Sequence, residues 1–388
     1  MNPRFAALTL GLAATLGAVS FPLVIAGEEP PRTAAGAKLG EETPLKGETV
    51  FIGAMKKIQD GLNLKNAGRR GQHPKQHGCV VAKFVVHDGL PKALRHGVFR
   101  EPKTYTAVIR FSNGATFDDR TPDAHGMAIK LVGVAGKQAL DTGQDGKTQD
   151  FVLMDHPVFF AKNIENLVGL TVALGAAKAA GNNKPLEVFA AAGHADEVRL
   201  VTKDTKKLPP NPLQIQYWST VPSRLGPGAV KYTAKPREPA AKGQGPGTSE
   251  NYLRAAMAAR LSGSKGPVIF DFCVQRQADP ARQPIEDATV AWTTPEEPVA
   301  SILIEPQEFD TPEQLEFCEN LIYTPWHALN AHRPLGSINR ARKPIYPVSA
   351  GLRHEIRKKE GKEPSSEAEP TEADLNRFRR PPRTRSDR

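Results

Sequence analysis

The sequence predicts an α+β protein whose core is an antiparallel β-sheet or β-barrel with helices around it. Short segments rich in β-branched and aromatic residues recur along the chain. Clusters of Gly, Pro, Asp and Asn separate them, which is the pattern of antiparallel strands joined by turns. Longer apolar segments of helical length lie between some of these strands.

The first expected strand covers residues 79–86, where Val, Ala and Phe dominate. The other expected strands cover residues 106–111, 127–132, 214–218, 229–232, 268–275, 288–292 and 299–304.

Helices are expected at residues 49–60, 165–180 and 251–261. A fourth begins at Thr311, because Thr can cap a helix, Pro312 suits its first turn and Gln314 can reach back to the cap.

Composition indicates a large globular core. The chain has 388 residues, of which 39% are hydrophobic and 24% charged. Its net charge of +10 would suit nucleic acid, an anionic membrane surface or acidic ligands. Much of that charge lies in the tail, at residues 357–362 and 377–388, and no basic stripe is interleaved with aromatic residues. We therefore expect no nucleic-acid partner and at most weak contact of the tail with anionic surfaces.

Both ends of the chain are expected to lie outside the folded domain. Residues 1–26 carry Arg4, a long apolar run and a cleavage-compatible end, as an export signal does. An anchoring helix is the alternative, but Pro22 and the polar residues 28–31 favour cleavage and export to a bacterial periplasm. Residues 27–48 are expected to form a linker, and residues 355–388 a disordered tail.

The three cysteines, Cys79, Cys273 and Cys318, are too few and odd in number for a disulfide framework. Each lies in an apolar setting, so we expect three buried thiols.

Two histidines, His73 and His77, lie in a basic loop before the first strand. A histidine at the mouth of a barrel could move protons, because its pKa lies near the working range. A solvated loop histidine is the alternative reading. Arg110, at the end of the second strand, could meet a carboxylate or form a structural ion pair.

Two further segments could belong to a site. Residues 150–160 are apolar with two adjacent aromatics, and they could line a flat hydrophobic ligand or simply pack in the core. Near the carboxyl end, Arg342 precedes Tyr346 by four residues, so a helix would place both on one face. A guanidinium there favours the phenolate, which is a known ligand of haem iron. Pro344 between them makes a regular helix doubtful.

In their order along the chain, these segments resemble the haem-dependent catalase superfamily, in its small catalase-like branch. The resemblance covers residues 49–354 and rests on five motifs. They are the loop from His73 to Gly78, the Arg110-Phe111-Ser112 run, residues 123–130 with His125 in place of arginine, residues 150–160, and Arg342-x-x-x-Tyr346. The resemblance implies an α+β fold with a catalase-like antiparallel β-barrel core.

It also implies roles for particular residues around haem b. Tyr346 would ligate the iron, with Arg342 as its charge partner. His73, or as second choice His77, would be the distal base that cleaves the O–O bond of a peroxide. The distal histidine would be supported by Ser112. Arg110 would contact a haem propionate, and Phe159 would line the cofactor.

One departure concerns the place where catalases have a distal asparagine, which here falls on Met154 or Asp155. Neither a thioether nor an ionised carboxylate donates a hydrogen bond, so efficient disproportionation is doubtful. We expect a catalase- or peroxidase-like enzyme acting on hydrogen peroxide or an organic hydroperoxide with an unidentified reductant. The alternatives are an exported haem-binding protein with little activity, and a structural envelope protein.

Overall fold

The computed structural model describes residues 39, 43–140, 147–262, 266–361 and 370–378, and its strands belong to one antiparallel sheet. The strands are β1 (Gln76–Val86), β2 (Thr104–Asn113), β3 (His125–Val132), β4 (Thr148–Met154), β5 (Tyr217–Trp218), β6 (Ser223–Leu225), β7 (Gly228–Pro236), β8 (Val268–Arg276) and β9 (Glu296–Ile304). Their order is β5-β4-β3-β2-β1-β9-β8-β7-β6, and an additional β5–β7 pairing closes the sheet into a barrel. The predicted α+β fold with an antiparallel barrel core is therefore confirmed.

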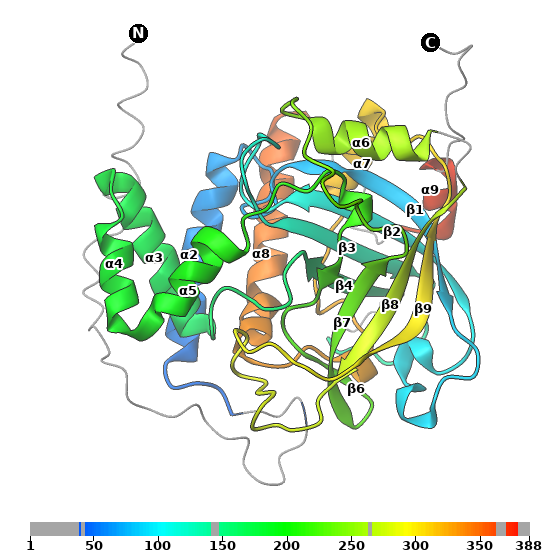
Figure 1. Cartoon of the computed structure of the whole chain (residues 1–388), viewed down its shortest axis with the longest axis horizontal. Coiled ribbons are helices and arrows are strands. Elements are labelled where there is room, and N and C mark those ends of the chain that lie inside the picture. The colour runs from blue at the N-terminus through cyan, green and yellow to red at the C-terminus, as the bar shows by residue number, and fades with distance from the viewer. Residues whose placement is uncertain (1–38, 40–42, 141–146, 263–265, 362–369, 379–388) are drawn as a thin grey trace.

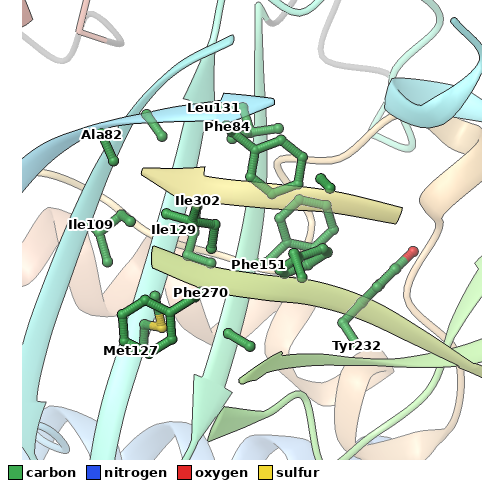
Figure 2. Packing of buried hydrophobic residues seen from close by; sticks show 14 of the residues in the cluster. Ala82, Phe84, Ile109, Met127, Ile129, Leu131, Phe151, Tyr232, Phe270 and Ile302 are labelled. Atoms are coloured by element: carbon green, nitrogen blue, oxygen red, sulfur yellow. The ribbon is translucent and has the colours of Figure 1, made fainter. Parts of the chain in front are cut away.

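Alternation along each strand separates the inside of the barrel from the outside. On β1, Val80, Ala82 and Phe84 belong to the interior cluster, whereas Cys79 and Val81 pack outside it. Figure 2 shows the interior side chains of several strands meeting in one apolar mass. Burying one Val, Leu or Phe side chain contributes about 1.5–3 kcal/mol, so this interior is a main source of stability.

The interior is closely packed with aromatic rings. Phe151 lies 4.8 Å from both Tyr232 and Phe272, measured between ring centroids, and Phe84 lies 5.0 Å from Phe272. The Tyr232 hydroxyl is satisfied by His332 Nδ1 at 2.8 Å. Because side chains fill the barrel, a site for a large flat ligand is more naturally sought on its outer wall.

Helices surround the barrel, and several of them pack on its outer wall. They are α2 (Glu48–Lys65), α3 (Ile164–Ala180), α4 (Lys184–Phe189), α5 (Ala195–Arg199), α6 (Tyr252–Leu261), α7 (Pro312–Asn320), α8 (Ser337–Lys359) and α9 (Glu372–Phe378). In Figure 1, α2 and α8 stand side by side next to the barrel, α3 and α4 lie to their left, α5 overlaps α2 in this view, and α6 and α7 lie at the top. Among the described residues, no helix combines the length and apolar character needed to cross a bilayer.

A second apolar cluster joins α2, α3 and α8 to the wall of the barrel. It consists of Met55, Met154, Phe159, Ala161, Ile164, Leu167, Val168, Val221, Ala288, Ile338, Ala341 and Ile345. We call it the helix–barrel cluster. Arg340 on α8 ties the same elements together through ion pairs with Glu48 at 2.8 Å and Glu286 at 2.7 Å.

The expected helices are confirmed, and one further helix continues through two prolines. Thr311 and Gln314 form the predicted capping box at the start of α7. Helix α8 runs through both Pro344 and Pro347, so the doubt about a regular helix there was wrong. Arg342 and Tyr346 therefore lie one turn apart on a single helix.

Three other expectations need correction. Residues 288–292 form no strand: Trp292 is buried beside Lys231, and its carbonyl accepts a hydrogen bond from the Gln275 side chain instead of a strand partner. The predicted strand at 214–218 is reduced to the two residues of β5. The tail expected to be disordered from residue 355 continues α8 to Lys359 and includes α9, whose Leu375 is buried.

The expectation of three thiols was wrong for two of them. Cys79 on β1 and Cys318 on α7 form a disulfide across a separation of 239 residues, while Cys273 is free and buried. Most of the predicted linker at residues 27–48 lies outside the described residues, and its last residue, Glu48, begins α2 and is buried. The predicted signal at residues 1–26 lies outside the described residues.

Candidate functional site

The loop between α2 and β1 holds His73 against the ends of β2 and β3. His73 has a left-handed backbone, with φ of 55°. Its amide donates to the Gly114 carbonyl at 2.7 Å, and its carbonyl accepts from Arg110 Nη2 at 2.9 Å. These bonds fix where the imidazole lies.

The His73 ring packs on the sheet at a position where no side chain projects from the strand below it. Its Nδ1 lies 3.1 Å from Ser112 Oγ, within hydrogen-bonding distance. Directly opposite Ser112 is Gly126, where a Cβ atom would come within 2.7 Å of His73 Nδ1. Any side chain at Gly126 would therefore push the ring out of its place.

The electrostatic setting keeps His73 neutral. Burial, and then the charge of Arg110, lower the pKa of His73 to about 4, although Asp123 and Asp155 act in the opposite direction. At neutral pH the imidazole is therefore unprotonated and able to accept a proton.

His77, the second candidate, lies in a different environment. It is buried, and its Nε2 lies 2.9 Å from Asn113 Oδ1. Asn113 in turn donates to Asp119, which pairs with Lys75 at 2.6 Å. Burial holds the pKa of His77 well below its usual range. His77 thus belongs to an internal polar network and does not share the position of His73.

Of the two residues at the asparagine position, Met154 shares a face with His73. Met154 pairs with Gly126 in the β3–β4 register, so its side chain emerges on the side of the sheet where the His73 ring lies. Asp155 is buried and turned to His125: one carboxylate oxygen accepts the His125 amide at 2.9 Å, and the other lies 2.9 Å from His125 Nδ1.

Phe159 and Tyr346 belong to the layer between the barrel and the helices. Phe159 lies in the helix–barrel cluster and stacks on Phe160 with centroids 4.2 Å apart. Tyr346 is partly exposed on α8. Among the described residues, its hydroxyl has no hydrogen-bond partner.

Arg342 contacts other groups than the phenol it was expected to accompany. Its Nη1 donates to Asn339 Oδ1 at 3.2 Å, and its guanidinium carbon lies 5.6 Å from the centroid of the Phe159 ring. The structure thus brings Arg342 and Phe159 together, while the pairing of Arg342 with Tyr346 stays a prediction.

Arg110 belongs to an ion cluster that sequence reasoning did not find. Arg70, Arg110 and Arg353 approach the Glu319 carboxylate at 3.1, 3.9 and 3.6 Å. We call these four residues the arginine cluster. The sequence spacing indicates part of this cluster. Arg353 follows Tyr346 by two helical turns on α8, and Arg70 precedes His73 by three residues. The residues around Glu319 in the sequence give no indication that it belongs to the cluster.

The cluster carries surplus positive charge in a buried place. Burial, followed by the charge of Arg70, lowers the pKa of both Arg110 and Arg353 to about 9. Burial alone would raise the pKa of Glu319, but the surrounding arginines lower it. Within the described residues, Arg110 Nε is buried and lacks a hydrogen-bond partner. Three guanidiniums around one carboxylate leave two positive charges that no acidic side chain of the cluster balances.

Comparison with solved structures identifies the fold. A bacterial catalase superimposes with a TM-score of 0.54 at 16% identity, covering 89% of this chain and 68% of that protein. A fungal catalase gives 0.52 at 14% identity, with 84% and 66% covered. Catalase A from Saccharomyces cerevisiae gives 0.53 at 15% identity, with 93% and 78% covered. No protein-family model and no curated protein sequence matches the chain. These similarities show a catalase-like fold.

Proposed function

Starting from this catalase-like fold, we propose that the protein is a haem-dependent enzyme that cleaves hydrogen peroxide or an organic hydroperoxide. The observation that carries the proposal is the neutral His73 imidazole beside Gly126, fixed by Ser112 at the ring and by the bonds of the His73 backbone to the Gly114 carbonyl and the Arg110 side chain. An unprotonated base held in one orientation is what proton transfer from a peroxide requires.

The residues present fit a haem group. Tyr346 has a hydroxyl without a partner among the described residues, so its phenolate could ligate the iron. Arg110, Arg70 and Arg353 would hold the carboxylates of the porphyrin, which would satisfy the unpartnered Arg110 Nε and the surplus charge. Phe159 offers an aromatic wall near Arg342.

In the proposed reaction, a bound haem would supply the two electrons that cleavage of the peroxide O–O bond requires. His73 takes the proton from one peroxide oxygen and returns it to the other, so that water leaves from hydrogen peroxide and an alcohol from an organic hydroperoxide. Ser112 holds the ring at Nδ1 and thereby leaves Nε2 for the proton. The helix–barrel cluster excludes bulk water from the wall of the site.

The distal side also supports an expectation of modest turnover. Met154 shares the face of His73, and its thioether cannot donate a hydrogen bond to a peroxide oxygen. We propose a peroxidase-like use of an external reductant over rapid disproportionation. The same observation favours the second candidate, a haem-binding protein with little or no turnover.

The test is peroxide consumption by the haem-loaded full chain. His73→Ala should bind haem like the wild type but lose about 100-fold or more of the rate of peroxide cleavage, the usual size of a lost general base. His87→Ala is the matched control, because His87 lies at the other end of β1 and bonds to Ser301. Full turnover in His73→Ala would overturn the assignment, and absence of turnover in haem-loaded wild type would favour the binding protein.

We further propose that the protein is exported to a bacterial periplasm. The Cys79–Cys318 disulfide supports this, because such bonds persist in oxidising compartments and are rare in the cytosol. Cell fractionation of the full chain and of a chain lacking residues 1–26 tests it. Recovery of both proteins in the cytosol would contradict the proposal.

A further inference from the structure

The backbone of His73 depends on support from outside its own loop. A positive φ is uncommon for a residue with a side chain, and here φ is 55°. One supporting bond comes from the neighbouring strand end, where the Gly114 carbonyl accepts the His73 amide. The other comes from a long side chain, Arg110, whose Nη2 donates to the His73 carbonyl at 2.9 Å. The position of the guanidinium therefore determines whether this second hydrogen bond can form.

The Glu319 carboxylate forms a buried ion pair with the same guanidinium nitrogen. Arg110 Nη2 lies 3.9 Å from Glu319 Oε2, and only 3% and 5% of the two side chains are exposed. Burial works against the charge of Arg110, whereas Glu319 favours it. Removing the carboxylate would leave a buried cation among other cations, and the guanidinium would move away from its present position.

The disulfide joins α7, which carries Glu319, to β1, the strand that pairs with β2, which carries Arg110. Cys318 directly precedes Glu319 on α7, and Cys79 lies directly opposite Arg110 in the β1–β2 register. Contacts therefore run without a break from the disulfide to Glu319, from Glu319 to Arg110, and from Arg110 to the backbone of His73.

We propose that Glu319 and Arg110 are positioning residues for His73, and that the Cys79–Cys318 disulfide keeps Glu319 in place for this task. The inference deepens the proposed function, on which the importance of His73 rests. It is nevertheless a statement about the conformation of the chain, so it can be tested without haem and without peroxide.

The first test is hydrogen–deuterium exchange of the haem-free, full-length protein. Glu319→Gln and Cys318→Ser should each raise exchange of the amides in residues 71–75 by about tenfold or more, because the His73 loop opens locally. Cys273→Ser is the control, since Cys273 is the free, buried thiol and should change nothing. Strand β8 should keep its protection in every variant.

Two results overturn the proposal. One is loop exchange that stays at the wild-type rate in Glu319→Gln. The other is faster exchange of the loop and of β8 alike, because that reports general loosening. If Cys318→Ser does not fold, Glu319→Gln decides the matter alone.

A second test measures the pKa of the His73 imidazole by NMR titration. The charged groups facing His73 are Arg110, Asp123, Asp155 and His125. Arg110→Gln should raise the pKa of His73 by about one unit, because it removes a lowering charge and admits water. Arg70→Gln shares the contact with Glu319 but not the bond to His73, so it should leave the pKa unchanged. Equal shifts in both, or none in Arg110→Gln, contradict the proposal. A haem-loaded protein without peroxide turnover would instead count against the proposed function alone.

Discussion

At the scale of single residues, the site depends on small groups as much as on reactive ones. Ser112 and Gly126 face each other on neighbouring strands, and their combined lack of bulk leaves the space that the His73 ring occupies. The sequence could predict His73 and Ser112 as partners through family resemblance. It could not predict the need for Gly126, because the clash that a side chain would cause is with a residue 53 positions away.

Gly126→Ala tests this packing. The added Cβ would come within 2.7 Å of His73 Nδ1, so we expect the ring to move and the rate of peroxide cleavage to fall about tenfold or more. Steady-state kinetics of the haem-loaded variant measures it. Gly53→Ala is the control, since a Cβ there meets nothing within 4 Å. Unchanged kinetics in Gly126→Ala would show that the His73 ring does not need this position.

The pKa of His73 gives a prediction for pH. With a pKa of about 4, the imidazole is neutral above roughly pH 5, so the rate of peroxide cleavage should be flat there and fall as pH drops through 4. The folded value lies below the ordinary one of about 6.5, so the unfolded chain takes up the proton first. The His73 contribution to stability is therefore complete above pH 6.5 and is lost as pH falls toward 4. A rate that declines already below pH 7 would contradict the assignment of His73 as the base.

At the scale of elements, local patterns predicted most strands because β-branched and aromatic residues are concentrated in them and turn residues separate them. Residues 288–292 show where this fails: Ala, Thr, Val and Trp have strand-like composition, yet Trp292 packs on the Lys231 ammonium and its segment pairs with no strand. The disulfide also could not be predicted from local patterns, because 239 residues separate Cys79 from Cys318. Only the tertiary fold brings β1 and α7 together.

Helix α8 carries Tyr346, and its attachment to α2 should be energetically important. Arg340→Ala removes a partly buried guanidinium shared by Glu48 and Glu286 and leaves two carboxylates facing each other. We expect a loss of about 2–4 kcal/mol in the free energy of unfolding, measured by urea denaturation. Arg276→Ala is the control, since its pair with Glu297 is half-exposed and should be worth less than about 1 kcal/mol. Equal losses in the two variants would show that the Arg340 cluster has no special role.

At the scale of the whole molecule, the barrel is a filled scaffold and the candidate site lies on its wall. His73 and Ser112 come from the amino-terminal part of the chain, whereas Tyr346 and Arg353 come from α8, which packs against α2 beside the barrel (Figure 1). The order of short motifs could predict this architecture, because the residue spacing within each motif and the order of the motifs resemble those of the catalase family. The arginine cluster could not be predicted in the same way, since Glu319 and its three partners come from separate elements.

The central claim, that a haem group is held through Tyr346, is tested most directly by titrating haem into the purified full chain and following its Soret absorbance. The account predicts saturable binding at one haem per chain, and binding at least about tenfold weaker in Tyr346→Phe, because the iron loses its ligand. Tyr105→Phe, which alters a tyrosine on β2 that packs beside Lys103, should bind like the wild type. Equal affinity in Tyr346→Phe and wild type, or no saturable Soret band in either, would contradict the claim.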